Sequence, residues 1–181
     1  MAAWFYPGGS DADRMASGFS WQHNYWCELL PSHAQNGEVN TARPVAISAM
    51  IVLAISLSLF WYFIPSLFPV KKITRLVISS CGIGSMLLLP FLLTGEHDRV
   101  MNLAALLGCT AILVLLVHLF KNKMLGLFWL GVACLLLCGI NNYVYYSEEL
   151  IHHLPVIQKI SFLVFLYWFV HLSFRLYKQH R

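Results

Sequence analysis

Five long apolar stretches run through most of the chain and are separated by short polar connections. A helix that crosses a bilayer needs about 20 mostly apolar residues, and each stretch is long enough. They are continuously apolar and lack the alternation of membrane strands. The sequence therefore predicts an all-α, polytopic membrane helix bundle with five transmembrane helices. The predicted helices span residues 44–68, 73–94, 100–120, 124–146 and 155–177, after an aromatic and polar N-terminal segment at residues 1–43.

The composition agrees with this pattern. The chain has 181 residues, of which 59% are hydrophobic and 11% are charged. Soluble domains are roughly 45–50% apolar and about 25% charged. This composition excludes a disordered chain and a nucleic-acid-binding protein, and it favours an integral membrane protein.

Lysine and arginine are distributed unevenly between the connections. Two connections and the C-terminal tail hold eight basic residues and no acidic one. They are Lys71, Lys72, Arg75, Lys121, Lys123, Arg175, Lys178 and Arg181. The opposite side holds all eight acidic residues and only four basic ones. The positive-inside rule then predicts a multi-pass membrane protein with a cytoplasmic C-terminus and an N-terminus outside.

The N-terminal segment has two interpretations, because no signal peptide precedes it in this sequence. A short tail can be translocated by the first helix that follows it. Alternatively, the sequence begins at the outer end of a further crossing helix. Trp4 and Tyr6, followed by Pro7-Gly8-Gly9, are typical of an interfacial aromatic belt and a helix end. A six-helix fold lacking its first helix would then place both termini inside.

Polar residues of the outer side form a predicted binding belt. Asn24, Trp26 and Glu28 lie in the N-terminal segment, and further polar side chains enter the outer ends of the last two helices. Polar groups in hydrocarbon are costly and usually face a bundle interior or a cavity. We therefore expect Asn142, Gln158 and Lys159 to converge on a pocket for a lipid headgroup or a small solute. The alternative is interhelical hydrogen bonding with Lys159 reaching the interface.

Two cofactor sites are alternative hypotheses. His97, Asp98 and His153 are residue types that bind zinc, which would suit a metal-dependent membrane lipid hydrolase, although no H-E-x-x-H motif is present. His118 and His171 lie at matching depth, about one turn inside the basic connections. Such a pair could supply both axial ligands of a b-type haem, as in a membrane cytochrome. A histidine near a helix C-terminus is also favoured by the helix dipole alone.

Several short patterns resemble a known group. They are Tyr6-Pro7-Gly8-Gly9, the segment Asn24-Tyr25-Trp26-Cys27-Glu28-Leu29, the polar stretch 36–43, and the connection from Asn142-Tyr143 to Gln158-Lys159. With these, the chain resembles bacterial relatives of the DRAM-like six-helix membrane proteins, although Cys27 stands where that group's pattern has Ser. The resemblance implies a six-helix plan and a multi-pass protein of a bacterial cytoplasmic membrane, and it supplies no catalytic residues.

Together, these features predict a small, non-enzymatic integral membrane protein without a cofactor. We expect it to bind membrane lipid, or a membrane protein partner or second copy, through its outer polar belt. The zinc hydrolase and the haem cytochrome stay open as alternatives.

Overall fold

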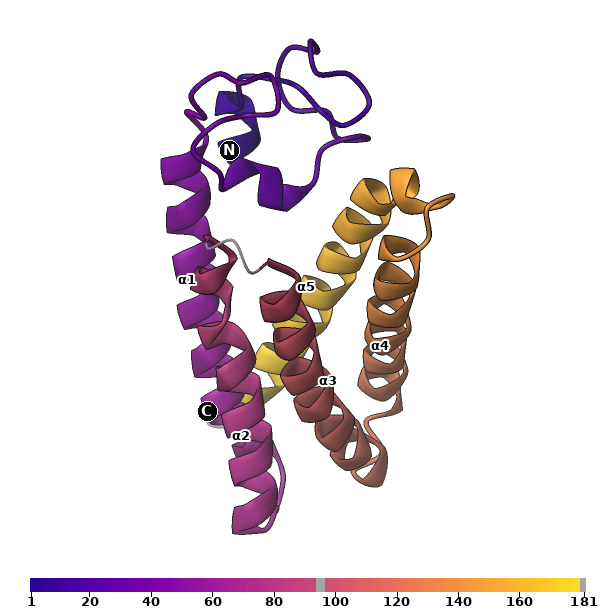
Figure 1. The fold of residues 1–181 in the computed structure, drawn as a ribbon. Coiled ribbons are helices and arrows are strands. Elements are labelled where there is room, and N and C mark those ends of the chain that lie inside the picture. The colour runs from indigo at the N-terminus through magenta and orange to yellow at the C-terminus, as the bar shows by residue number, and fades with distance from the viewer. Residues whose placement is uncertain (94–96, 180–181) are drawn as a thin grey trace. The chain divides into compact units, whose positions relative to one another are not determined.

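The computed structural model describes residues 1–93 and 97–179, and it is helical throughout its regular elements (Figure 1). Within these ranges it contains no strand, only the isolated bridges Gly8–Ser17 and His33–Val39. The predicted all-α fold with five long helices is confirmed. The helices are α1 (Arg43–Phe63), α2 (Lys72–Leu87), α3 (His97–Lys121), α4 (Leu125–Tyr145) and α5 (Leu154–Gln179).

Short 3₁₀ turns extend three of these helices. They are η3 (Ile64–Leu67) after α1, η4 (Leu89–Leu93) after α2 and η5 (Ile151–His153) before α5, while η1 (Ala2–Phe5) and η2 (Trp26–Leu29) lie in the N-terminal segment. Within the described residues, five helices are apolar enough, by length and composition, to cross a membrane. Their candidate spans are Arg43–Leu67, Lys72–Phe91, Asp98–Lys121, Leu125–Tyr145 and Ile151–Gln179.

Prolines explain why α1 and α2 end before the apolar stretches do. Pro65 and Pro90 have no backbone N–H, so neither can donate to the carbonyl four residues earlier. The carbonyl of Trp61, which Pro65 leaves free, instead accepts a hydrogen bond from Ser79 Oγ at 3.0 Å. The apolar pattern alone predicts one continuous helix over each stretch, because it does not register these breaks.

The turn between α3 and α4 is tight. Lys123 adopts a left-handed conformation with φ 56°. Its N–H donates to Phe120 O and the N–H of Met124 donates to Leu119 O, at 3.0 and 2.9 Å. This is the Schellman pattern that ends helices. It makes α3 and α4 an antiparallel hairpin.

The chain forms two compact units, which we describe separately. The first comprises Met1–Val52 with Ile140–Ile160, and the second comprises Leu53–Gly139 with Ser161–Arg181. The helices α1, α4 and α5 each contribute residues to both units. The first unit contains the candidate site described below.

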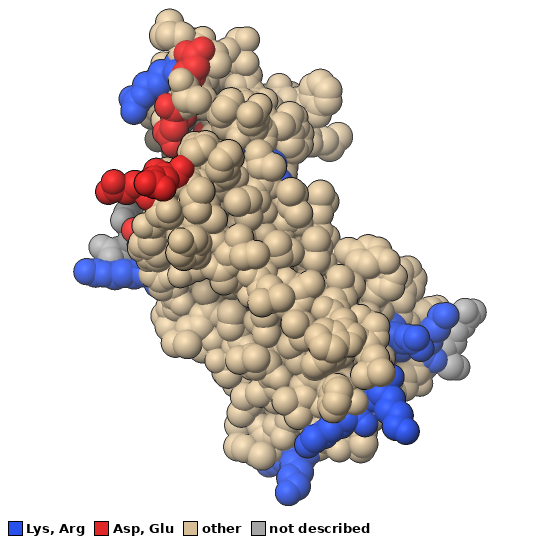
Figure 2. All heavy atoms as spheres, turned by 90° about the vertical axis from the view of Figure 1, so that its right-hand side faces the viewer, with Lys and Arg blue, Asp and Glu red and all other residues tan. Residues whose placement is uncertain are grey.

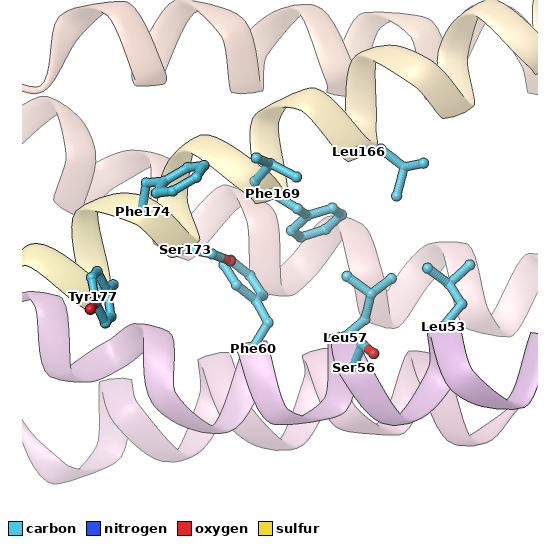
Figure 3. A pocket seen from close by; sticks show the side chains of 10 residues that line it. Leu53, Ser56, Leu57, Phe60, Leu166, Phe169, Ser173, Phe174 and Tyr177 are labelled. Atoms are coloured by element: carbon cyan, nitrogen blue, oxygen red, sulfur yellow. The ribbon is translucent and has the colours of Figure 1, made fainter.

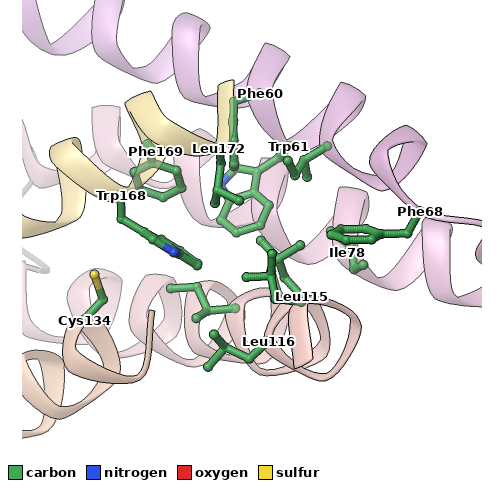
Figure 4. Packing of buried hydrophobic residues seen from close by; sticks show 14 residues of the cluster. Phe60, Trp61, Phe68, Ile78, Leu115, Leu116, Cys134, Trp168, Phe169 and Leu172 are labelled. Carbon is green, nitrogen blue, oxygen red and sulfur yellow. The ribbon is translucent and has the colours of Figure 1, made fainter. Parts of the chain in front are cut away.

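The second unit has one hydrophobic core built around two fully buried tryptophans, Trp61 and Trp168 (Figure 4). Trp168 Nε1 donates to Leu127 O at 2.8 Å, which satisfies its polar atom. Glycines let helices approach these rings: Gly82 faces Trp61, and a Cβ added at Gly131 would lie 2.6 Å from both Trp168 and Leu116. The core therefore depends on small residues placed opposite large ones.

Candidate binding site of the N-terminal segment

The N-terminal segment ends at residue 42 in the structure, because α1 begins at Arg43. It folds back on itself through its Pro7-Gly8-Gly9 sequence. Gly9 N–H donates to Ala16 O at 2.7 Å, and Gly8 O accepts from Asn36 N–H at 3.2 Å. Gly9 has φ 84°, and a Cβ there would collide with the backbone at Gln35 and Asn36. Only glycine fits such a position. These residues, which the sequence suggests as a helix end, form the centre of a folded segment.

Asn24 connects the parts of this segment and is fully buried. Its Oδ1 accepts from Ser20 N–H at 2.7 Å, and its Nδ2 donates to Gly9 O at 2.7 Å and to Glu28 Oε2. Every polar atom of this side chain therefore has a partner. Burying an amide is tolerated only under that condition. Asn24 holds the segment together from inside.

Residues at the start of α5 bind the N-terminal segment. Lys159 Nζ donates to the backbone oxygen of Asn24 at 2.6 Å and to Pro155 O at 3.0 Å. Gln158 Oε1 accepts from Trp26 N–H at 3.2 Å, and Tyr25 OH donates to Ile151 O at 3.3 Å. Five of the six residues predicted for the binding belt, all but Asn142, therefore lie in one cluster.

Two aromatic rings lie next to the Lys159 ammonium group. Its Nζ lies 5.5 Å from the centroid of the Phe19 ring and 5.8 Å from that of Trp26. Phe19 stacks on Trp26 at 5.7 Å, and Trp21 meets both rings edge-on. Such ring faces attract a cation electrostatically. Phe19 belongs to this cluster, and the sequence gives no signal for it beyond its place in an aromatic run.

Glu28 is the buried acid of the cluster. Its Oε2 accepts from Asn24, and its Oε1 is buried without a hydrogen-bond partner among the described residues. Burial raises the pKa of this carboxyl above its ordinary value, while the hydrogen bond from Asn24 and the charge of Lys159 act in the opposite direction. Trp26 Nε1 is also buried and unpartnered within the described part of the chain. The cluster thus retains one acceptor and one donor that its own residues leave unused.

Asn142 lies apart from these residues in the contacts that the structure gives. It is an exposed residue of the last turn of α4. Gln158 and Lys159 instead pair with the N-terminal segment, across 132 and 135 residues of sequence. Asn40 is a second buried amide, which the sequence pattern does not single out: its Nδ2 donates to Glu28 O at 3.2 Å and Pro31 O at 3.0 Å.

The predicted zinc ligands form no cluster within the part of the chain that the structure describes. The side chain of His97 lies outside the described residues, while Asp98 and His153 are exposed. His153 packs against its neighbour His152, with ring centroids 3.8 Å apart. Among the described residues, no three His, Cys, Asp or Glu side chains lie close enough to hold a metal ion. The zinc site stays a prediction.

The two histidines of the haem hypothesis belong to the second unit. His118 packs against Phe68, with ring centroids 5.9 Å apart. His171 packs against Tyr167 of its own helix at 4.1 Å, and its Nδ1 lies 3.0 Å from Tyr167 O. These contacts give each imidazole a local neighbour, and the haem site also stays a prediction.

Comparison of the chain with protein-family models, with curated proteins and with solved structures finds no match. The resemblance to the DRAM-like group therefore rests on the short sequence patterns alone.

Proposed function

We propose that the protein is a multi-pass membrane protein whose N-terminal segment is a folded binding module at the outer membrane surface. The observation that carries this proposal is the different placement of polar and apolar side chains in the segment. The polar residues Asn24, Gln158 and Lys159 are engaged in internal hydrogen bonds, whereas large apolar residues point outward. Met1, Trp4, Phe5, Met15 and Trp21 are all more than half exposed.

The exposed apolar helix surface supports membrane insertion. In the second unit, Leu76, Leu106, Leu136 and Leu163 are each at least 60% exposed. Soluble monomers rarely expose apolar surface on this scale, because its contact with water is unfavourable. Lipid chains would cover these side chains. The basic connections support a cytoplasmic C-terminus and a segment outside.

Lipid is the partner that this surface suits best. Trp4 is 87% exposed and Phe5 is 55% exposed, on the short η1 turn. Aromatic side chains concentrate at the level of the lipid headgroups, where an apolar ring and a polar atom are both satisfied. A protein partner is the second candidate, since an exposed apolar patch also marks protein interfaces.

Quenching of Trp4 fluorescence tests the lipid assignment. The full chain is reconstituted in bilayers whose lipids carry bromine near the top of the acyl chains, and the difference between wild type and Trp4→Phe isolates the Trp4 signal. We expect strong quenching, with unbrominated bilayers as the control. An unquenched Trp4 would place this side chain in water and overturn the lipid assignment in favour of a protein partner.

A further inference from the structure

The second unit carries two apolar surface grooves of similar size that differ at their ends. One lies between α1 and α5, is about 550 Å³ in volume and has serine and tyrosine as its polar lining (Figure 3). The other lies between α3 and α4, is about 610 Å³ in volume and is lined by Lys121 as well as by apolar side chains. Only the α3–α4 groove thus ends on a charged residue of its own lining.

The α3–α4 groove has the dimensions of a lipid chain site. Leu113, Val117 and Phe120 line it from one face of α3, and Phe128 and Val132 line it from α4. From Leu113 to Lys121 the helix rises about 12 Å. This is most of the roughly 15 Å that one leaflet contributes to the hydrocarbon core. An extended acyl chain fits this depth, with its headgroup at the lysine end.

The charge at that end is positive and unopposed. Lys123 follows Lys121 in the turn, and residues 99–147 contain no Asp or Glu. Asp98, the one acidic residue among the described residues of this unit, lies at the other end of α3, about 35 Å away along the helix. In the face drawn in Figure 2, most of the visible Lys and Arg side chains gather in one region, away from the Asp and Glu side chains. An anionic headgroup therefore complements this end of the groove.

We propose that the α3–α4 groove is a binding site for one phospholipid with an anionic headgroup. Its acyl chain lies against Val117 and Val132, and its phosphate faces Lys121 and Lys123. The proposal rests on membrane insertion but not on the N-terminal segment. It assigns the lipid to the leaflet on the side of the basic connections, where cytoplasmic membranes carry their anionic lipids.

The two grooves offer matched variants for a test. Val117 in the α3–α4 groove and Val170 in the α1–α5 groove are 49% and 48% exposed, so tryptophan at either position extends into its own groove from a similarly exposed site. Delipidated full-length protein is titrated in detergent with phosphatidylglycerol or phosphatidylcholine, and bound lipids are counted by native mass spectrometry. Circular dichroism and melting temperature verify that each variant is folded.

We expect one phosphatidylglycerol molecule to bind in preference to phosphatidylcholine. Lys121→Gln with Lys123→Gln should weaken its binding about 25-fold, since each basic group near an anionic headgroup contributes about fivefold. Val117→Trp should abolish binding, and Val170→Trp should leave it unchanged. Equal retention of both lipids, or equal effects of the two tryptophan variants, would overturn the proposal. If the wild type is dimeric and Val117→Trp makes it monomeric without changing lipid binding, a second copy of the chain covers the groove. This result would also overturn the proposal.

Discussion

At the scale of single residues, Asn24 and Lys159 show how a polar cluster can be structural and leave the proposed binding surface beside it. One hydrogen bond of Lys159 Nζ ties the backbone of Asn24 to α5, and a second one goes to Pro155 O in the first turn of the same helix. The sequence supports the expectation that such polar residues gather, because unpaired polar groups are costly in an apolar environment. It does not identify Asn24 as the partner of Lys159. A contact between a side chain and a backbone oxygen 135 residues away has no signature in the spacing of polar and apolar residues.

Glu28 should make the N-terminal segment sensitive to pH. Its pKa in the folded protein is raised above 4.5 by burial and by the charge of Asp11, although Asn24 and Lys159 lower it. Compared with the unfolded chain, the folded protein therefore binds the proton of this carboxyl more tightly. This stabilisation is fully present below pH 4.5 and is lost as the pH rises through the raised pKa. We expect hydrogen exchange of residues 20–30, corrected for intrinsic rates, to show a more protected segment at pH 4.5 than at pH 7.5.

Glu28→Gln is the matching variant. Glutamine keeps an oxygen that can accept the hydrogen bond from Asn24 and carries no charge, so the variant should lose the pH dependence and stay protected at pH 7.5. Glu38→Gln, at an exposed position, serves as the control and should behave like wild type. If Glu28→Gln opened the segment at pH 7.5, the ionised carboxylate would be required and this account of Glu28 would be wrong.

At the scale of the helices, the apolar runs predict the number and order of the elements, and local chemistry decides their ends. The run at residues 73–94 continues past Pro90, yet α2 ends at Leu87 because proline cannot donate to the carbonyl of Met86. The contact faces are harder to predict. All five helices are apolar on most sides, so the pattern does not show that Gly82 faces Trp61 or that Gly131 faces Trp168.

The glycines of α4 allow a direct test of this packing. A Cβ at Gly131 would lie 2.6 Å from Trp168 and Leu116, whereas a Cβ at Gly126 on the same helix meets nothing within 4 Å. We expect Gly131→Ala to lower stability by about 1–3 kcal/mol through overpacking. Gly126→Ala should be neutral or stabilising by up to about 1 kcal/mol, because alanine favours helices. Thermal unfolding in detergent measures both, and equal melting temperatures for the two variants would contradict the packing described here.

At the scale of the whole chain, the proposed roles depend on which connections face which side of a membrane. Five spanning helices, an odd number, would place the two termini on opposite sides. By the positive-inside rule, the basic residues after α1 and α3 and near the end of α5 would then mark the cytoplasmic side. The proposed roles follow from this topology, since the exposed aromatic residues would meet the outer surface and the α3–α4 groove would open toward the inner leaflet.

Cysteine accessibility in intact cells tests this topology most directly. Ala12→Cys lies in the exposed part of the N-terminal segment, and Asn122→Cys lies in the exposed turn between α3 and α4. The wild-type chain, with its five native cysteines, is the background control. We predict that a membrane-impermeant maleimide labels Ala12→Cys in intact cells and labels Asn122→Cys only after the membrane is opened. Labelling of Asn122→Cys in intact cells, or protection of Ala12→Cys until the membrane is opened, would contradict the account.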